Sequence, residues 1–229
     1  MNPPSPARTA GRSEPEPILE LGCAENLRRD EAMLRGGGPG ARVAVLADRA
    51  ISIGVTVLDS SAVVRRARAA GWSILRRGSG GTAVLHAPGD LAWSIVLPRS
   101  DPRVGRDYAR HYDRLGAAVR RCLAEEGVAT EWGPPPDRSA EYCLLGPRGS
   151  VLRADGRVLG GAAQHVSGTA LLHHGILLRR VEVGPLRQIF DLGNRELNEL
   201  TGLDALGVSA SSLALGGRLA RCLREDWTG

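Results

Sequence analysis

The sequence contains no lysine. All 30 of its basic residues are arginine, and 25 acidic residues leave a formal net charge of +5 over 229 residues. A site that needs a lysine as a base or as a cationic contact therefore cannot take it from this chain. The arginines are interspersed with acidic residues and form no basic run interleaved with aromatics, so nucleic acid is not an expected partner.

Aromatic residues, paired cysteines and long apolar runs are also scarce or absent. Aromatics make up 3% of the residues, so the core has to be built from Ala, Val, Leu and Ile. The four cysteines form no CxxC pair, which argues against a zinc site. No stretch has the length of a membrane span, and the first residues lack the apolar segment of a secretory signal. We therefore expect a cytoplasmic protein with reduced thiols and no membrane partner.

Apolar periodicity and turn residues predict helices and strands along the whole chain. Helices are expected at 24–35, 60–70 and 107–127, of which the last is the longest. Strands are expected at 42–47, 51–57, 72–75, 82–85, 91–96, 142–145, 150–153, 157–164 and 169–178. Asp155-Gly156 is typical of a hairpin turn. From residue 194 the tail is expected to hold two helices around 206–208, with Ser209 as an N-cap.

The most informative stretch runs from Arg76 to Val96. Arg76 and Arg77 precede a loop of one serine and three glycines, and a β-rich run follows. Glycines let backbone N–H groups approach a ligand closely, and arginines supply forked donors for a carboxylate or a phosphate. An anion-binding loop and an ordinary glycine-rich turn are equally compatible with these residues. The spacing fits neither a P-loop nor a dinucleotide fingerprint.

As a whole, this stretch resembles the signature of the lipoate–protein ligase and octanoyltransferase family, which shares its catalytic fold with biotin–protein ligases. The matching residues are Arg76, Arg77, Ser79, Gly80, Gly81, Ala83, Val84, His86, Gly89, Leu91 and Ser94. Thr82 stands where a third glycine is usual, and Ala87 where an Asp usually follows the histidine. The family's first-helix pattern is matched by Asn26, Asp30, Glu31, Ala32 and Leu34. The resemblance implies that the loop wraps an acyl chain.

A second family signature is a hairpin followed by a strand with His-Gly. It is matched by Asp155, Gly156, Arg157, Gly161, Ala163, Gln164, His174 and Gly175. The lysine of this signature is replaced by Val158. In the family that lysine contacts the acyl-adenylate of the ligases or pairs with the catalytic thiol of the transferases. Arg157 is adjacent but is expected on the opposite face of the strand, and arginine cannot act as a base. Val158→Lys is expected to increase transfer if the pocket is otherwise intact.

Cys143 stands where the cysteine-dependent octanoyltransferases carry their acyl-accepting thiol. It is either the nucleophile or a small buried residue of a strand, and the two interpretations are equally weighted. Arg76, Arg77 or a histidine could favour its thiolate. The other cysteines, Cys23, Cys122 and Cys222, are expected to be packing residues.

The histidines are too scattered to suggest a metal site. His86 is expected near the pocket, and of the neighbours His173 and His174 only one can face it, with His174 favoured by the motif. His111 is expected on a helix surface. His165 is a minor candidate for the pocket border.

The resemblance implies an α/β fold with a mixed, mainly antiparallel sheet flanked by helices. Residues 1–20 are expected to be a disordered tail, 21–193 the catalytic domain and 194–229 a helical extension. The first functional hypothesis is transfer or ligation of octanoyl or lipoyl groups to a lysine of a lipoyl-domain protein, with Cys143 as nucleophile. Its candidate substrate-binding residues are Arg76, Arg77, Ser79, Gly80, Gly81, Thr82, Ala83, His86, Gly161, Ala163 and His174.

Two alternatives stay open at this point. One is a non-catalytic homologue that binds an acyl ligand or a carrier domain, which the missing lysine favours. The other is biotin transfer, against which the lipoate-type hairpin argues. Lipoate or octanoate is the expected substrate, ATP and Mg²⁺ are needed only by a ligase, and acyl carrier protein is a second candidate partner.

Overall fold

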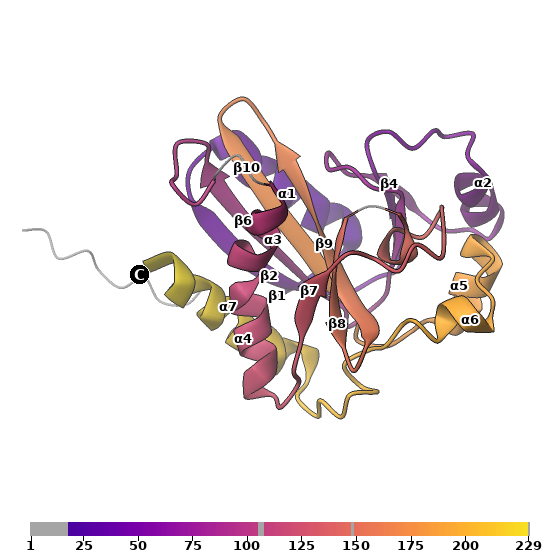
Figure 1. The fold of residues 1–229 in the computed structure, drawn as a ribbon. Helices are drawn as coiled ribbons and strands as arrows, with labels where there is room; N and C mark the ends of the chain where they lie inside the picture. Colours follow the sequence, from indigo (N-terminus) through magenta and orange to yellow (C-terminus); the bar gives the residue numbers. More distant parts are fainter. Residues whose placement is uncertain (1–17, 105–107, 148, 229) are drawn as a thin grey trace, which may run out of the picture.

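The computed structural model describes residues 18–104, 108–147 and 149–228, and two sheets organise it (Figure 1). The predicted N-terminal tail lies outside these ranges up to residue 17. The sheets are mixed but mainly antiparallel and helices flank them, so the expected fold class is confirmed. None of the helices in the described ranges has the length and apolar character that crossing a bilayer requires.

The large sheet has seven strands in the order β1-β2-β6-β10-β9-β8-β7. Only β1 and β2 are parallel; all other neighbours run antiparallel. In that order the strands are Leu19–Leu21, Gly40–Leu46, Leu91–Pro98, Ala170–Leu177, Arg157–Val166, Ser150–Ala154 and Glu131–Gly133. The long strands β6, β10 and β9 form its centre, which Figure 1 shows in magenta and orange.

Successive side chains of a strand point to opposite faces of the large sheet, and each face packs against a different set of helices. On β2, β6 and β10, odd-numbered residues such as Trp93 and Leu171 pack with α4 (Ala117–Glu125) and α7 (Ser212–Thr228). Even-numbered residues such as Val96 and Ile176 lie on the opposite face, which α1 (Cys23–Gly36) covers. Because α7 packs against β2 and α4, the C-terminal helix is part of this core. The boundary predicted at residue 194 stays a prediction.

The small sheet has the order β4-β3-β5, with bounds Ile74–Arg76, Ala50–Ile53 and Ala83–His86. It packs with α2 (Ala62–Ala69), α5 (Val183–Phe190) and α6 (Asn194–Leu197), which lie together at the right of Figure 1. Strand β3 ends at Ile53, earlier than predicted. A Cβ on the next residue, Gly54, would lie 2.0 Å from the carbonyl oxygen of Gly81, so only a glycine lets these two segments meet.

Several predictions differ from the structure. The helix predicted at 107–127 is two helices, α3 (Tyr108–Leu115) and α4, of which neither is the longest. They separate at Gly116, where a Cβ would lie 2.2 Å from the indole nitrogen of Trp132. Residue 107 lies outside the described ranges. Helix α7 is capped by the side chain of Ser211, which accepts from the amide of Ala214, and not by Ser209. Helix α5 has no counterpart among the predicted elements.

The strand predicted at 142–145 is a 3₁₀ turn, η1 (Cys143–Leu145). Its tight backbone bonds run from the Leu145 amide to the Tyr142 carbonyl and from the Gly146 amide to the Cys143 carbonyl. Tyr142 anchors the turn because its ring is buried against Phe190, with ring centroids 4.8 Å apart. Cys143 is therefore held on a turn beside the small sheet, while Leu144 and Leu145 enter the core.

Candidate active site

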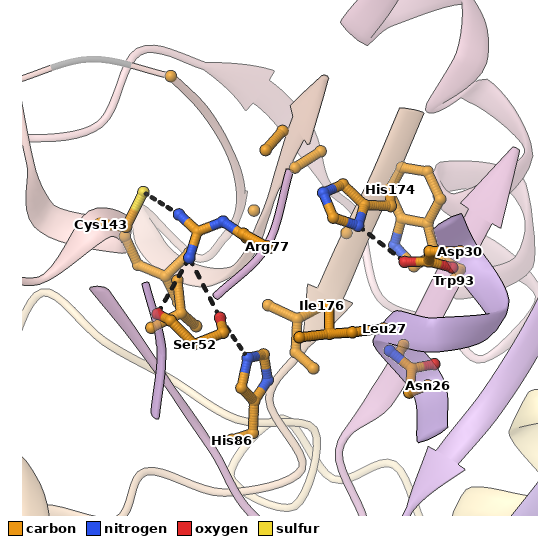
Figure 2. Close-up of a pocket in the computed structure, with 18 of the residues that line it drawn as sticks. Asn26, Leu27, Asp30, Ser52, Arg77, His86, Trp93, Cys143, His174 and Ile176 are labelled. Carbon is orange, nitrogen blue, oxygen red and sulfur yellow. Dashed lines mark hydrogen bonds and ion pairs between the residues drawn. The ribbon is translucent and has the colours of Figure 1, made fainter. Parts of the chain in front are cut away.

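A cavity of about 70 Å³ lies where the loop after β4 meets strands β8 and β9 (Figure 2). The two sequence signatures therefore fold over one space. Its polar lining residues are Asn26, Asp30, Ser52, Arg77, His86, Cys143, Ser150 and His174. Its larger apolar lining residues are Leu27, Val84, Ala92, Trp93, Leu144, Val151 and Ile176.

Two glycines on neighbouring strands give the cavity its depth. Gly161 on β9 and Gly175 on β10 both line it. A Cβ on Gly175 would lie 2.5 Å from the ring of Trp93, and one on Gly161 would lie 2.6 Å from Leu144. The missing side chains leave room for the Trp93 ring to form part of the wall, so this end suits an apolar chain.

Arg77 and Cys143 form the polar end of the cavity. Arg77 Nη2 lies 3.9 Å from Cys143 Sγ, and the arginine is only 5% exposed. Its guanidinium also donates to the carbonyls of Ser52, Gly80 and Thr82, at 3.0, 2.9 and 3.1 Å. Burial lowers the pKa of Arg77 from its usual value and Cys143 raises it, but an arginine stays charged. A fixed cation therefore lies beside the sulfur.

His86 and Ser52 extend this polar end. Ser52 Oγ lies 3.1 Å from Arg77 Nη1 and 2.8 Å from His86 Nε2. Burial, together with the charges of Arg77 and His174, lowers the pKa of His86 to about 3. His86 is therefore neutral at physiological pH, and the arginine is the cation of this group.

A second polar group lies on the opposite side of the cavity, as Figure 2 shows for the His174–Asp30 pair. His174 Nδ1 lies 2.9 Å from Asp30 Oδ2, and His174 Nε2 lies 2.8 Å from Ser79 Oγ. Arg42 and Ser94 also donate to Asp30, each at 2.5 Å. Burial alone would raise the pKa of Asp30, but these partners hold it below its usual value, so the carboxylate is ionised.

Strand register explains why these groups converge. Arg42 on β2 pairs with Ser94 on β6, which pairs with His174 on β10. The three side chains therefore form a row across the face that α1 covers. Asp30 is on the buried side of that helix, only 2% exposed, and meets the row.

The predicted site residues divide into those at the cavity and those away from it. Arg77, His86, Cys143, Gly161, Ala163 and His174 line it. Ser79 is buried beside it, and Gly80 and Gly81 are exposed in the loop next to Cys143. A Cβ on Gly81 would lie 2.7 Å from the sulfur. Thr82 continues the loop, and its carbonyl accepts from Arg77.

Arg76 and Ala83 are not brought to the cavity. The Arg76 guanidinium bonds the carbonyls of residues 54, 55 and 57 and the carboxylate of Asp59, because it points away from its neighbour Arg77. Ala83 is fully buried in the hydrophobic cluster of the small sheet. Val158 is also fully buried in this cluster and does not line the cavity, whereas Arg157 is exposed.

The remaining histidines and cysteines are structural, with one correction. His111 was expected on a helix surface, but it is buried, with 1% of its surface exposed. Its Nδ1 lies 3.4 Å from Gln164 Oε1. His173 is buried on the far face of β10 against Trp93. His165 lies against Gly78. Cys23, Cys122 and Cys222 are buried as expected, and burial is the first cause that raises the pKa of each thiol. No group of three or more His, Cys, Asp or Glu suited to a metal ion occurs among the described residues.

Three further residues line the cavity but were not predicted as site residues: Asp30, Ser52 and Trp93. A usable signal was present for Asp30. Cys23, Asn26, Asp30 and Leu34 form the buried face of α1. Two polar residues on the face that should be apolar indicate a polar partner inside the molecule.

Comparisons with known proteins agree on one family. The family model described as "Lipoyl protein ligase A/B catalytic domain" matches residues 24–213. The chain is 31% identical over 195 residues to Octanoyltransferase LipM of Exiguobacterium sp., covering 77% of this chain and 69% of that protein. It is 26% identical over 189 residues to Octanoyltransferase LipM of Macrococcus caseolyticus, covering 76% and 68%.

Solved structures share the fold. A lipoate-protein ligase A crystallised with ATP has a TM-score of 0.73 at 22% identity, covering 93% of this chain and 86% of that one. A putative lipoate protein ligase from T. acidophilum with bound lipoic acid has a TM-score of 0.72 at 23% identity, with coverage of 93% and 86%.

Proposed function

This chain belongs to the lipoyl protein ligase A/B catalytic domain family, and on that premise we propose that it transfers octanoyl or lipoyl groups to a lysine of lipoyl-domain proteins. The observation that carries the proposal is the partly exposed Cys143, which lines the cavity beside the buried Arg77 cation. Of the four cysteines, Cys143 alone is not buried.

In the first half of the reaction, Cys143 accepts the acyl group from a donor thioester. The thiolate attacks the carbonyl carbon, the new bond to Sγ forms, and the donor's C–S bond breaks to release the donor thiolate. The oxyanion that develops needs hydrogen-bond donors. Gly81 is adjacent to the sulfur, and in the described part of the chain the amides of Gly80 and Gly81 donate to no backbone carbonyl, so they are suited to this role.

The cavity supplies the binding site for the acyl chain. Apolar side chains form much of its wall, with Leu27 and Ile176 labelled in Figure 2 between the two polar groups. Burying methylene groups there contributes about 0.8 kcal/mol per CH₂. A medium-length chain is therefore favoured over a short one.

The donor separates a transferase from a ligase. A thiol exchanges readily with a thioester, whereas a free acid must first be activated, for example with ATP. The LipM relatives are named octanoyltransferases, and Cys143 stands at the cavity, so we favour a carrier-bound acyl donor such as octanoyl acyl carrier protein. The ligase with bound ATP shares only the fold, so an ATP requirement is the outcome to be tested. A role limited to binding is less well supported than transfer.

The experiment is a transfer assay with two donors. The protein is mixed with a purified lipoyl domain and either octanoyl acyl carrier protein or octanoate with ATP and Mg²⁺. Intact mass of the lipoyl domain reports modification. We expect octanoylation from the carrier-bound donor, lost in Cys143→Ala and independent of ATP. Modification only with octanoate and ATP would identify a ligase, and none from either donor would contradict transfer.

A further inference from the structure

The second half of the reaction requires a base. A lysine side chain has a pKa of about 10.4 in water, so the acceptor arrives as an ammonium and must lose a proton before its nitrogen can attack. The family's lysine position holds the buried Val158 here, and the chain contains no lysine. We propose, as a deepening of the proposed function, that His174 is the general base that takes this proton, with Asp30 as its positioning residue and Ser79 as the link to the acyl-binding loop.

The hydrogen bonds fix which histidine nitrogen can accept the proton. Asp30 is ionised and lies 2.9 Å from Nδ1, so Nδ1 carries the hydrogen and donates it to the carboxylate. Nε2 is then left with its lone pair, which accepts from the Ser79 hydroxyl at 2.8 Å. The imidazolium formed on protonation would be stabilised by the adjacent carboxylate.

Ser79 ties this base to the acyl-binding loop. It is two residues before Gly81, where a Cβ would lie 2.7 Å from the Cys143 sulfur, and it precedes Gly80, whose carbonyl accepts from Arg77. His174 and Cys143 both line the cavity, so Nε2 can take the proton of an amine that enters the cavity to reach the Cys143 thioester. Ser79 itself is 1% exposed and does not line the cavity, whereas Cys143 does, so the nucleophile is assigned to the thiol.

No other lining group suits the role. The nitrogen bases among the described lining residues are His86 and His174. His86 has a pKa of about 3 and is too weak a base near neutral pH. Arg77 is always protonated. His174 keeps 12% of its side-chain surface exposed and can return its proton to solvent.

The acyl group passes from Cys143 to the acceptor lysine in one sequence of bond changes. The acceptor ammonium gives one proton to His174, and the free amine attacks the thioester carbonyl to form the C–N bond. The C–S bond then breaks, and Sγ leaves with the electron pair beside Arg77. The nitrogen then loses its second proton to the leaving sulfur, which regenerates the thiol. His174 releases its proton to solvent.

The test compares two nucleophiles on one acyl-enzyme. Octanoyl-Cys143 is prepared from wild type and from His174→Gln, and its decay is followed by intact mass with a lipoyl domain or with hydroxylamine. Hydroxylamine is uncharged at neutral pH and needs no base to become nucleophilic. We expect His174→Gln to acylate normally, to react about 100-fold more slowly with the lipoyl domain, and to react with hydroxylamine at the wild-type rate.

Asp30→Asn and Ser79→Ala should show the same selective loss, smaller in size. A wild-type rate of lipoyl-domain transfer in His174→Gln would overturn the inference. An equal slowing with both nucleophiles, or failure of the variant to acylate, would also overturn it, since His174 would then support the site's structure or the first half-reaction. Absence of an adduct on wild-type Cys143 would instead contradict the proposed function, and with it the inference that rests on it.

Discussion

The thiol and its cation are 66 positions apart in the chain and meet through the fold. Arg77 is buried, so little water screens its charge from the sulfur. Its neighbour Arg76 bonds a different set of carbonyls outside the cavity, including that of Val57 at 2.8 Å. The two arginines therefore form a matched pair for testing the electrostatic role.

Arg77→Gln is expected to slow alkylation of Cys143 by iodoacetamide about tenfold at neutral pH, because the cation 3.9 Å from the sulfur is lost. Arg76→Gln should change the rate less than about twofold, since an exposed and distant charge is screened. The time course of mass increase on each variant, with Cys143→Ala as blank, gives both rates. Equal alkylation of the two variants would remove Arg77 from this role.

The structure changes the expectation for Val158→Lys. The side chain is fully buried among apolar residues and does not line the cavity, so a lysine there places an ammonium without a partner in the core. We expect the free energy of unfolding to fall by about 3 kcal/mol, with no gain of transfer. Val158→Met, of similar length and uncharged, is the control for overpacking. If both variants are equally stable in urea and the lysine variant is more active, the ammonium reaches the thiol and the expectation is wrong.

At the scale of elements, β9 and β10 shape the cavity through their glycines. A Cβ on Gly161 would lie 2.6 Å from a Leu144 methyl group and push that side chain into the acyl space. Gly161→Ala is expected to lower kcat/KM for an octanoyl donor about tenfold relative to a butanoyl donor. Gly168→Ala, in the turn between the same strands with open space around it, should leave the ratio unchanged. A parallel loss for both chain lengths would count against a chain-binding cavity.

Local sequence patterns predicted an element well where the residues that fix its ends lie within a few positions of it. The helix at 24–35 and the Asp155-Gly156 hairpin are present, because capping glycines and turn residues act within a few positions. The break at Gly116 depends on Trp132, and the turn at Cys143 depends on the packing of Tyr142 against Phe190. Neither contact leaves a signal in the neighbouring residues.

The site was predictable in the same partial way. The family resemblance made Arg77, Cys143 and His174 candidates, and all three line the cavity. The direction of Arg76 follows from the meeting of β4 with β3, which local sequence does not encode. The convergence of Arg42, Ser94 and His174 on Asp30 requires the register of three strands and the docking of α1. Strand register is a property of the folded sheet.

At the scale of the whole molecule, buried histidines make stability depend on pH. Burial, with smaller effects from His174 and His111, lowers the pKa of His173 to about 3, against about 6.5 when unfolded. As pH falls below 6.5 the unfolded chain binds a proton that the folded one does not, so stability falls with pH. Asp90 works in the opposite direction, because burial raises its pKa to about 7.

His173→Phe isolates this contribution. Both ring nitrogens of His173 lack a hydrogen-bond partner in the described residues, and the ring packs on Trp93 and Tyr112, so phenylalanine should be tolerated. Between pH 7.5 and pH 5, wild type should lose about 2 kcal/mol of unfolding free energy relative to the variant. Urea unfolding at both pH values measures the difference. Parallel losses in the two proteins would show that His173 titrates normally.

The most direct test of whether the cavity holds an acyl chain bound to Cys143 is the intact mass of the protein after incubation with octanoyl acyl carrier protein. One octanoyl adduct is predicted on the wild type, mapped to Cys143. The adduct should be absent from Cys143→Ala and retained in Cys122→Ala, whose thiol is buried away from the cavity. An adduct that persists in Cys143→Ala, or a wild-type protein that acquires none, would contradict the claim.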